Sequence, residues 1–312
     1  MKKIAFHSNQ LGIRGTEVAL YQYAKYNEEI LGNKSVIFTF PNSDHSAIDK
    51  FKDRFEVVLL DWWNYENYLV DNNFDYLYMI KMGTRDGYEL SKIPTLIHAV
   101  FRHNEPHGYK YFYVSDWLAK DQGYDPETHS LPHICEKLPE PEYDFRERHG
   151  IPKDVTVFGC YGGSTEFNIE STKEAIKKAV QERTDLYFIF MNINQFVDHP
   201  QVKFFPSSYD LKEKSSFVEA CDAMIHARSG GETFGLAISE FALSNKPVIT
   251  YGLSGERNHL DILGERAIIY KGYDDLLEIF KNLKSYIKYE DYDTPYKQFS
   301  PEIIMNKFKN FL

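Results

Sequence analysis

One segment of the chain combines two glycines and two glutamates at a spacing that suits ligand binding or catalysis. Residues 223–250 read as a strand, a glycine turn, a helix and a second strand, and Glu232 and Glu240 lie in it with seven residues between them. Gly230 and Gly231 allow the chain to turn tightly after the first strand. Glu232 precedes the predicted helix, so its carboxylate can face a sugar bound at the helix start.

The start of that helix is a candidate site for a diphosphate. Its first residues, after Thr233, are Phe234, Gly235 and Leu236. The first amide groups of a helix lack partners within the helix itself, so those at this helix start are expected donors for an anion. Glu240 lies about one and a half turns further on, within reach of the ribose hydroxyls of the same nucleotide. A plain strand, turn and helix with surface glutamates is the alternative.

Short apolar runs alternate with amphipathic stretches in both halves of the chain, which predicts strands joined by crossover helices in parallel sheets. In the first half the strands are predicted at 3–8, 35–39, 56–60, 76–80, 94–100 and 111–114, with helices near 16–31, 46–51, 63–72 and 116–122. In the second half the strands are predicted at 155–160, 187–191, 202–205, 223–226, 247–250 and 267–270, with helices near 171–183, 210–220, 234–243 and 273–288. The fold class is therefore α/β, with two Rossmann-like domains.

The boundary is placed at residues 138–142, where Pro139 and Pro141 can neither continue a helix nor donate to a sheet. The expected domains are 1–142 and 143–295, followed by a tail, 296–312, that carries a last amphipathic segment.

Composition narrows the class of protein. No apolar run approaches the roughly 20 residues that span a bilayer, and the N-terminus leads straight into a strand, so we expect a cytoplasmic protein without a signal peptide. The three cysteines are scattered, which argues against disulfides. A formal charge of −10 argues against a nucleic-acid partner or an anionic membrane, so any phosphate site must be local.

Taken in order, the two glutamates, Phe234-Gly235-Leu236 and Lys246-Pro247-Val248-Ile249 resemble the donor-site motif of the retaining family 4 glycosyltransferases of GT-B fold (glycosyl transferases group 1). The resemblance extends over most of the chain. It implies two parallel sheets facing across a cleft, with the first domain on the acceptor side, the second binding the donor, and the helix in 296–312 packing back on the first domain.

Near the N-terminus, a glycine-rich loop opens the first helix and resembles the family's loop that approaches donor phosphate or acceptor. Its residues include Gly12, Gly15 and Thr16. A purely structural turn after the first strand is the alternative. The family also has a histidine after a first-domain strand that touches the sugar, and here His98 and His103 are the candidates for that catalytic position. Either could instead be an ordinary hydrogen-bonded histidine.

The sequence departs from the family where an Arg and a Lys usually bind the diphosphate, because Cys160 and Glu166 stand there instead. Neither can balance phosphate charge. Arg228 and Arg257 are the candidate replacements, each with the alternative of a solvated loop charge. The loop of Gly162 and Gly163 could offer backbone amides to an anion.

The resemblance implies transfer of a hexose from a nucleotide-diphosphate sugar, such as a UDP- or GDP-hexose, to a glycan or other hydroxyl acceptor. Glu232 would orient the donor sugar, and no cofactor or metal would be needed. The histidine pairs His103/His107 and His129/His133 have metal-like spacing, but Pro106 and Pro132 interrupt any helix that would align them, so no zinc site is expected. Two alternatives remain: a catalytically idle nucleotide or glycan binder, and a sugar-nucleotide epimerase.

Overall fold

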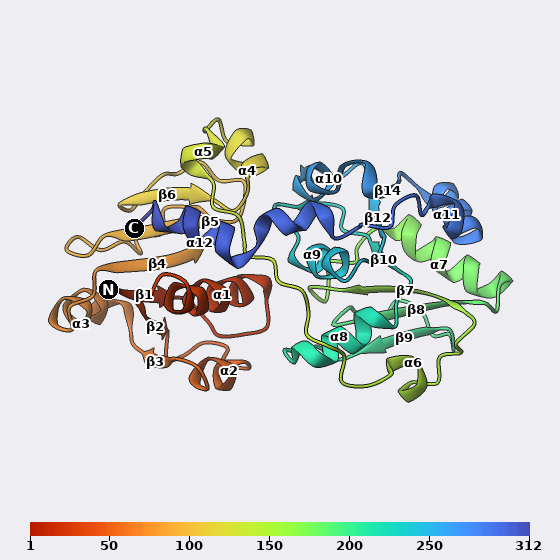
Figure 1. Cartoon of the computed structure of the whole chain (residues 1–312), viewed down its shortest axis with the longest axis horizontal. Coiled ribbons are helices and arrows are strands. Elements are labelled where there is room, and N and C mark those ends of the chain that lie inside the picture. The colour runs from red at the N-terminus through yellow and green to blue at the C-terminus, as the bar shows by residue number, and fades with distance from the viewer. The chain divides into compact units, whose positions relative to one another are not determined.

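The computed structural model describes the whole chain, residues 1–312. The chain divides into two compact units, which are Met1–Ile134 with Phe299–Leu312 (unit 1) and Cys135–Gln298 (unit 2). Both sheets are parallel and six-stranded, and the α/β GT-B fold expected from the sequence is confirmed (Figure 1).

The sheet of unit 1 has the strand order β3-β2-β1-β4-β5-β6. Its strands are β1 (Lys3–His7), β2 (Lys34–Thr39), β3 (Glu56–Leu59), β4 (Tyr76–Lys81), β5 (Thr95–Ala99) and β6 (Lys110–Tyr113). The central strands are buried on both faces, which is why they read as continuous apolar runs rather than as alternating ones. The order reverses between β1 and β4, so the crevice between their carboxyl ends is the switch point where open α/β sheets bind ligands.

The helices of unit 1 are α1 (Gly15–Glu29), α2 (Ile48–Lys52), α3 (Tyr65–Asp71), α4 (Asp116–Asp121), α5 (Pro126–His129) and α12 (Pro301–Lys309), with a 3₁₀ turn η1 (Trp62–Asn64). The hydroxyl of Ser115 caps α4 by accepting from the amide of Leu118 at 3.1 Å, and Asp125 caps α5 in the same way through Glu127. The short helix α5 is absent from the sequence prediction.

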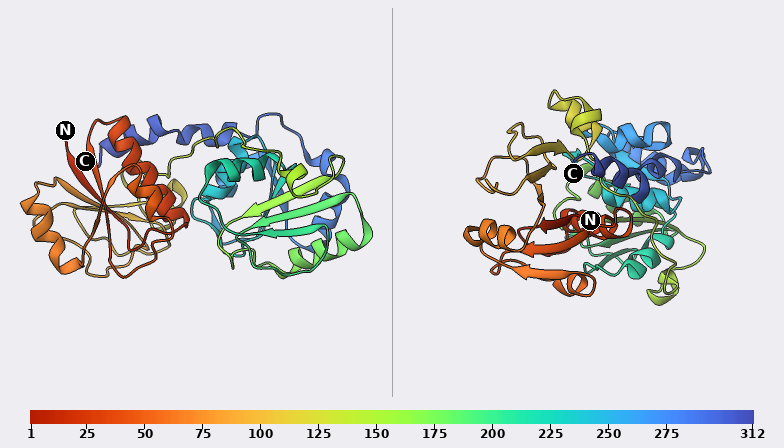
Figure 2. Two further views of the ribbon diagram at one scale, coloured as in Figure 1. Left: turned by 90° about the horizontal axis from the view of Figure 1, so that it is seen from below. Right: turned by 60° about the vertical axis from the view of Figure 1, so that its left-hand side comes forward.

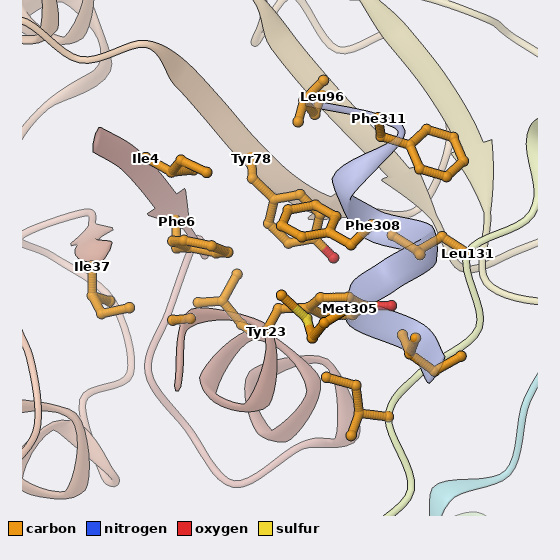
Figure 3. Packing of buried hydrophobic residues seen from close by; sticks show 14 of the residues in the cluster. Ile4, Phe6, Tyr23, Ile37, Tyr78, Leu96, Leu131, Met305, Phe308 and Phe311 are labelled. Atoms are coloured by element: carbon orange, nitrogen blue, oxygen red, sulfur yellow. The ribbon is translucent and has the colours of Figure 1, made fainter. Parts of the chain in front are cut away.

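Helix α12 completes the core of unit 1. It lies beside α1, and its Met305 and Phe308 are fully buried (Figure 3). The ring of Phe308 is 5.4 Å from the rings of both Tyr23 and Tyr78. The two chain termini lie close together in this unit (Figure 2), where the ammonium of Lys2 donates to the carbonyl of Leu312 at 2.6 Å. The C-terminal segment is therefore a structural part of unit 1.

The sheet of unit 2 has the strand order β14-β12-β10-β7-β8-β9. Its strands are β7 (Thr156–Tyr161), β8 (Leu186–Met191), β9 (Val202–Phe205), β10 (Ala223–His226), β12 (Val248–Tyr251) and β14 (Ala267–Tyr270). Here the order reverses between β7 and β10, which makes the crevice between their carboxyl ends the switch point of this sheet.

The helices of unit 2 are α6 (Phe145–Arg148), α7 (Glu170–Glu182), α8 (Leu211–Glu219), α9 (Leu236–Leu243), α10 (Asn258–Leu263) and α11 (Tyr273–Tyr286), with the 3₁₀ turn η2 (Gly264–Arg266). A further 3₁₀ turn, η3 (Thr294–Phe299), ends at the first residue of the C-terminal segment of unit 1. A separate two-stranded sheet pairs β11 (Gly231–Glu232) with β13 (Glu256–Arg257). This small sheet and the helices α6 and α10 are absent from the sequence prediction, because such short elements carry too few residues to show a period.

Unit 2 begins at Cys135, whereas the prolines predicted that the second domain begins at residue 143, eight residues later. The proline-containing segment is bound to α8, since the hydroxyl of Ser215 donates to the carbonyl of Pro139 at 2.5 Å and the hydroxyl of Ser216 accepts from the amide of Glu142 at 3.0 Å. These contacts make the segment part of unit 2.

Candidate donor site

Glu232 is placed by a turn that only glycine can make. Gly231 has a φ of +83°, and a side chain there would collide with the carbonyl of Glu256 on the paired strand β13. The turn returns the chain toward the carboxyl end of β10 directly after that strand, so Glu232 faces the last residue of the strand, His226. The glycine predicted to allow a tight turn is thus also the residue that allows β11 and β13 to pair.

Both oxygens of the Glu232 carboxylate have partners. Oε1 is 3.2 Å from Nε2 of His226, and Oε2 accepts from Nη1 of Arg228 at 3.0 Å. Burial alone would raise the pKa of this carboxyl group, but the hydrogen bond from His226 and the charge of Arg228 outweigh it, so the pKa lies below its ordinary value. Glu232 is therefore an anion at neutral pH, held in one orientation.

A buried chain of hydrogen bonds, the relay, holds the His226 ring on the side away from Glu232. The Nδ1 atom of this ring lies 2.9 Å from the hydroxyl of Thr250, and that hydroxyl lies 3.0 Å from Nε2 of His259. Burial lowers the pKa of His259 to about 3, so this ring is neutral, and its Nδ1 has no partner. One consistent assignment follows: His259 donates to Thr250, Thr250 donates to His226, and His226 donates to Glu232.

Glu240 lies in α9, which begins after Gly235 in the left-handed conformation, with φ +94°. Its Oε2 accepts a hydrogen bond from the hydroxyl of Tyr161, the last residue of β7, and is 3.7 Å from the ammonium of Lys214. Neither contact uses Oε1. Because Tyr161 ends the strand beside the switch point, Glu240 is held next to the crevice where a ligand is expected.

The start of α9 is firmly anchored. Thr233 and Phe234 are buried, and the carbonyl of Phe234 accepts from the side-chain amide of Asn258 at 3.3 Å. Gly235 is the N-cap residue and Leu236 is the first helical residue. The predicted amide donors therefore lie at a helix start with a fixed backbone, as an anion site requires.

The two arginines proposed as phosphate cations differ in their surroundings. Arg228 follows β10 at the switch point and forms ion pairs with Glu166, through Nε, and with Glu232. Arg257 pairs in register with Glu232 in the small sheet, and its exposed guanidinium donates to the carbonyl of Gly252 at 3.0 Å. Arg228 is thus held by two carboxylates, whereas Arg257 has a neutral partner.

The loop after β7 lies on the other side of the same switch point. The carbonyl of Gly162 accepts from the side chain of Asn192 at 2.7 Å, and that of Gly163 accepts from the amide of Glu166 at 2.9 Å. Cys160, near the end of β7, is buried, and burial raises the pKa of its thiol. The chain therefore has no cation at that position.

In unit 1 the predicted glycine loop follows β1 at the switch point of that sheet. A side chain on Gly12 would crowd the carboxylate of Asp44, and the loop is fastened by backbone hydrogen bonds from Leu11 to Asp44 and from Ala47 to Leu11, both 2.8 Å. Gly15 begins α1 and Thr16 follows it.

The two candidate histidines are in different environments. His98 lies inside β5, fully buried, with Nδ1 2.6 Å from the hydroxyl of Tyr78, so it is a core histidine, the alternative that the sequence left open. His103 lies in the loop after β5, partly exposed, and its carbonyl accepts from the hydroxyls of Tyr111 and Tyr113 at 3.3 and 3.2 Å. Of the two, only His103 lies at the carboxyl edge of the sheet.

Two groups at this site were not found from the sequence. One is the relay of Thr250 and His259, and the other is the pair that Glu166 makes with Arg228. The available signal for the relay was His226 at the end of a predicted strand. The residues linked to His226, which are Glu232, Thr250 and His259, come from three other segments of the chain. No group of three or more His, Cys, Asp or Glu side chains is placed to hold a metal ion, and the helices are all too short or too polar to cross a membrane.

No protein-family model matches the sequence. Nor does any curated protein match it. Solved structures do resemble the fold over nearly the whole chain. HepE from Anabaena, in complex with UDP-glucose, superposes with a TM-score of 0.75 at 14% identity and covers 100% of this chain and 99% of its own. A glycosyltransferase from Rickettsia africae gives 0.72 at 14% identity, covering 99% and 97%.

A protein from Listeria monocytogenes assigned as a UDP-N-acetylglucosamine 2-epimerase gives a TM-score of 0.64 at 13% identity, covering 99% of this chain and 95% of its own. At such identities the likeness shows the GT-B fold, which these proteins share.

Proposed function

We propose that the chain is a glycosyltransferase that moves a hexose from a nucleotide-diphosphate sugar to a hydroxyl group of a glycan or other acceptor. The observation that carries this proposal is the arrangement at the switch point of unit 2. There an anchored helix start, an oriented carboxylate (Glu232) and a second carboxylate (Glu240) stand at the carboxyl edge of one sheet. The UDP-glucose complex of HepE, which has the same fold, supports a nucleotide sugar as the donor.

In this proposal each group has one task. The amides at the start of α9 and the guanidinium groups of Arg228 and Arg257 stabilise the charge of the leaving diphosphate. Glu232, held ionised by His226 and Arg228, accepts hydrogen bonds from the donor sugar, and Glu240 accepts them from the ribose through Oε1. Gly12, Gly15, Thr16 and His103 lie at the corresponding edge of unit 1, the acceptor side.

Transfer is proposed to retain the anomeric configuration and to need no metal, since amides and cations stabilise the leaving group. We therefore expect EDTA to leave the rate of transfer or donor hydrolysis unchanged, and added Mg²⁺ or Mn²⁺ to change it by less than about twofold. A complete loss of activity with EDTA that Mn²⁺ restores would contradict this part of the proposal.

A sugar-nucleotide epimerase is the second candidate, because the Listeria monocytogenes protein has the same fold. A panel of UDP- and GDP-sugars incubated with the protein separates the candidates. Slow release of nucleoside diphosphate and free sugar indicates a transferase, a changed sugar still attached to its nucleotide indicates an epimerase, and binding without either product indicates an idle binding protein. The proposal predicts the first result, with the first-formed sugar, before it mutarotates, in the anomeric configuration of the donor.

A further inference from the structure

The loop after β7 crosses the switch point of unit 2 and is fastened to the loop after β10. The amide of Asn168 donates to the carbonyl of Ala227 at 2.9 Å, and its side-chain oxygen accepts from the amide of Ser229 at 2.8 Å. Glu166 forms an ion pair with Arg228 between these same loops. Asn168 by itself connects the two loops through two hydrogen bonds, so the Glu166 carboxylate is not needed to hold the loops together.

The turn that carries Glu166 directs its side chain. The amide of Glu166 donates to the carbonyl of Gly163 at 2.9 Å, and a Cβ on Gly163 would lie only 2.7 Å from Cγ of Glu166. The Glu166 side chain therefore lies over the bare backbone of Gly163. The side chain is 41% exposed, so its carboxylate can move away from Arg228 into solvent without disturbing the core.

Arg228 carries a single positive charge against two carboxylates. Nε faces Glu166 and Nη1 donates to Glu232 at 3.0 Å, and the negative charge of Glu256 also acts on the guanidinium. A diphosphate that approaches this guanidinium meets a cation whose charge two carboxylates already balance. Removing one of these carboxylates frees that charge, and Glu166 has the more exposed side chain of the two, at 41% against 22% for Glu232.

We propose that Glu166 is an internal competitor of the diphosphate: it occupies the Nε edge of Arg228 in the empty site, and a bound nucleoside diphosphate takes its place. Glu232 keeps its own edge of Arg228 throughout. This inference rests on the proposed donor site and defines how tightly that site holds its nucleotide. Its consequence is weak binding of the nucleoside diphosphate product, which favours product release.

Isothermal titration of UDP and GDP into the full chain tests the inference. Glu166→Gln keeps the shape of the side chain and removes its charge, so we expect the affinity for whichever nucleotide binds to rise roughly threefold to thirtyfold. The affinity for the matching nucleoside, uridine or guanosine, should not change. Glu170→Gln is the matched control: it removes the same charge four residues away, where the carboxylate pairs with Lys173 instead, and should leave both affinities unchanged.

Repeating the Glu166→Gln substitution in an Arg228→Ala protein distinguishes competition for Arg228 from direct repulsion of the diphosphate. In Arg228→Ala the two carboxylates have lost their shared cation. Adding Glu166→Gln to this variant should therefore raise the nucleotide affinity much less than it does when Arg228 is present. An equal gain in affinity with and without Arg228 would mean that Glu166 simply repels the diphosphate, and it would overturn the inference. An unchanged affinity in Glu166→Gln and in Glu166→Ala, with wild-type protein that binds UDP or GDP, overturns it while the proposed function stands. If no variant binds either nucleotide, both fail.

Discussion

Glu240 links the helix α9 to the end of the central strand β7, because its Oε2 accepts from the hydroxyl of Tyr161. That contact does not use Oε1, the oxygen that the proposed function assigns to the ribose. We expect Glu240→Ala to weaken binding of UDP or GDP by about 1.5–3 kcal/mol, the contribution of charge-assisted hydrogen bonds. The loss should be similar for the bare nucleoside, since the ribose is present in both, and calorimetry measures both.

The matched control for Glu240 is Glu219→Ala, which removes another carboxylate of unit 2 that pairs with a lysine, Lys246, at 3.2 Å. It should not affect nucleotide binding. Unchanged affinity in a folded Glu240→Ala protein would remove Glu240 from the site.

At the scale of the elements, the small sheet of β11 and β13 determines where Glu232 lies. Gly231→Ala places a methyl group against the carbonyl of Glu256 at a positive φ, so we expect a loss of at least about 2 kcal/mol in stability and a clear loss of nucleotide binding. Urea unfolding followed by circular dichroism, together with calorimetry, measures the two effects. Gly230→Ala is the control, because a side chain there meets open space at an ordinary φ. Equal behaviour of the two variants would contradict the assigned role of the turn.

Helix α12 contributes large side chains to a core whose residues outside the C-terminal segment lie between Ile4 and Ile134. Phe308→Ala removes a fully buried ring that packs against both Tyr23 and Tyr78, and should cost about 3–5 kcal/mol of the stability of unit 1. All three tryptophans, Trp62, Trp63 and Trp117, belong to unit 1, so tryptophan fluorescence during urea unfolding reports this unit.

The control for Phe308 lies on the same helix. Ile303 is 52% exposed, and Ile303→Ala should change the stability of unit 1 by less than about 1 kcal/mol. A cost for Ile303→Ala as large as that for Phe308→Ala would show that α12 packs on a different face.

At the scale of the whole molecule, buried neutral histidines predict a dependence of stability on pH. Burial lowers the pKa of His7 to about 4 and that of His133 to about 3, and places that of His98 well below its ordinary value of 6.5. In the unfolded chain these rings take up protons as the pH falls below about 6.5, whereas in unit 1 they do not. The unfolded state then binds more protons, so unit 1 loses stability as the pH falls from 6.5 toward 4.

Each of these histidines should contribute about 1.4 kcal/mol per pH unit within that window. Urea unfolding followed by tryptophan fluorescence at pH 7.5, 6.5, 5.5 and 5.0 measures the slope for unit 1. His133→Gln should reduce that slope, whatever it does to the stability at pH 7.5. A stability that is constant between pH 7.5 and 5.0 would contradict the prediction.

The sequence by itself predicted the two α/β units, the succession of their main strands along the chain, and the strand, turn and helix that carry Glu232 and Glu240. It could do so because hydrophobic periodicity and glycine turns are local properties, and because parallel strands bring their carboxyl ends to one edge. The adjacency of Glu232, the start of α9 and Glu240 follows from that pattern alone.

Only the tertiary structure decided which side chains face one another. It placed His98 in the core, joined His226 to Thr250 and His259, and set Glu166 against Arg228. These residues come from segments up to about 60 positions apart, and their contacts depend on strand register, turn geometry and side-chain rotamers, none of which is local to a short stretch of sequence. The sequence could show that Glu166 replaces an expected cation, but not that its carboxylate pairs with the arginine proposed to replace that cation.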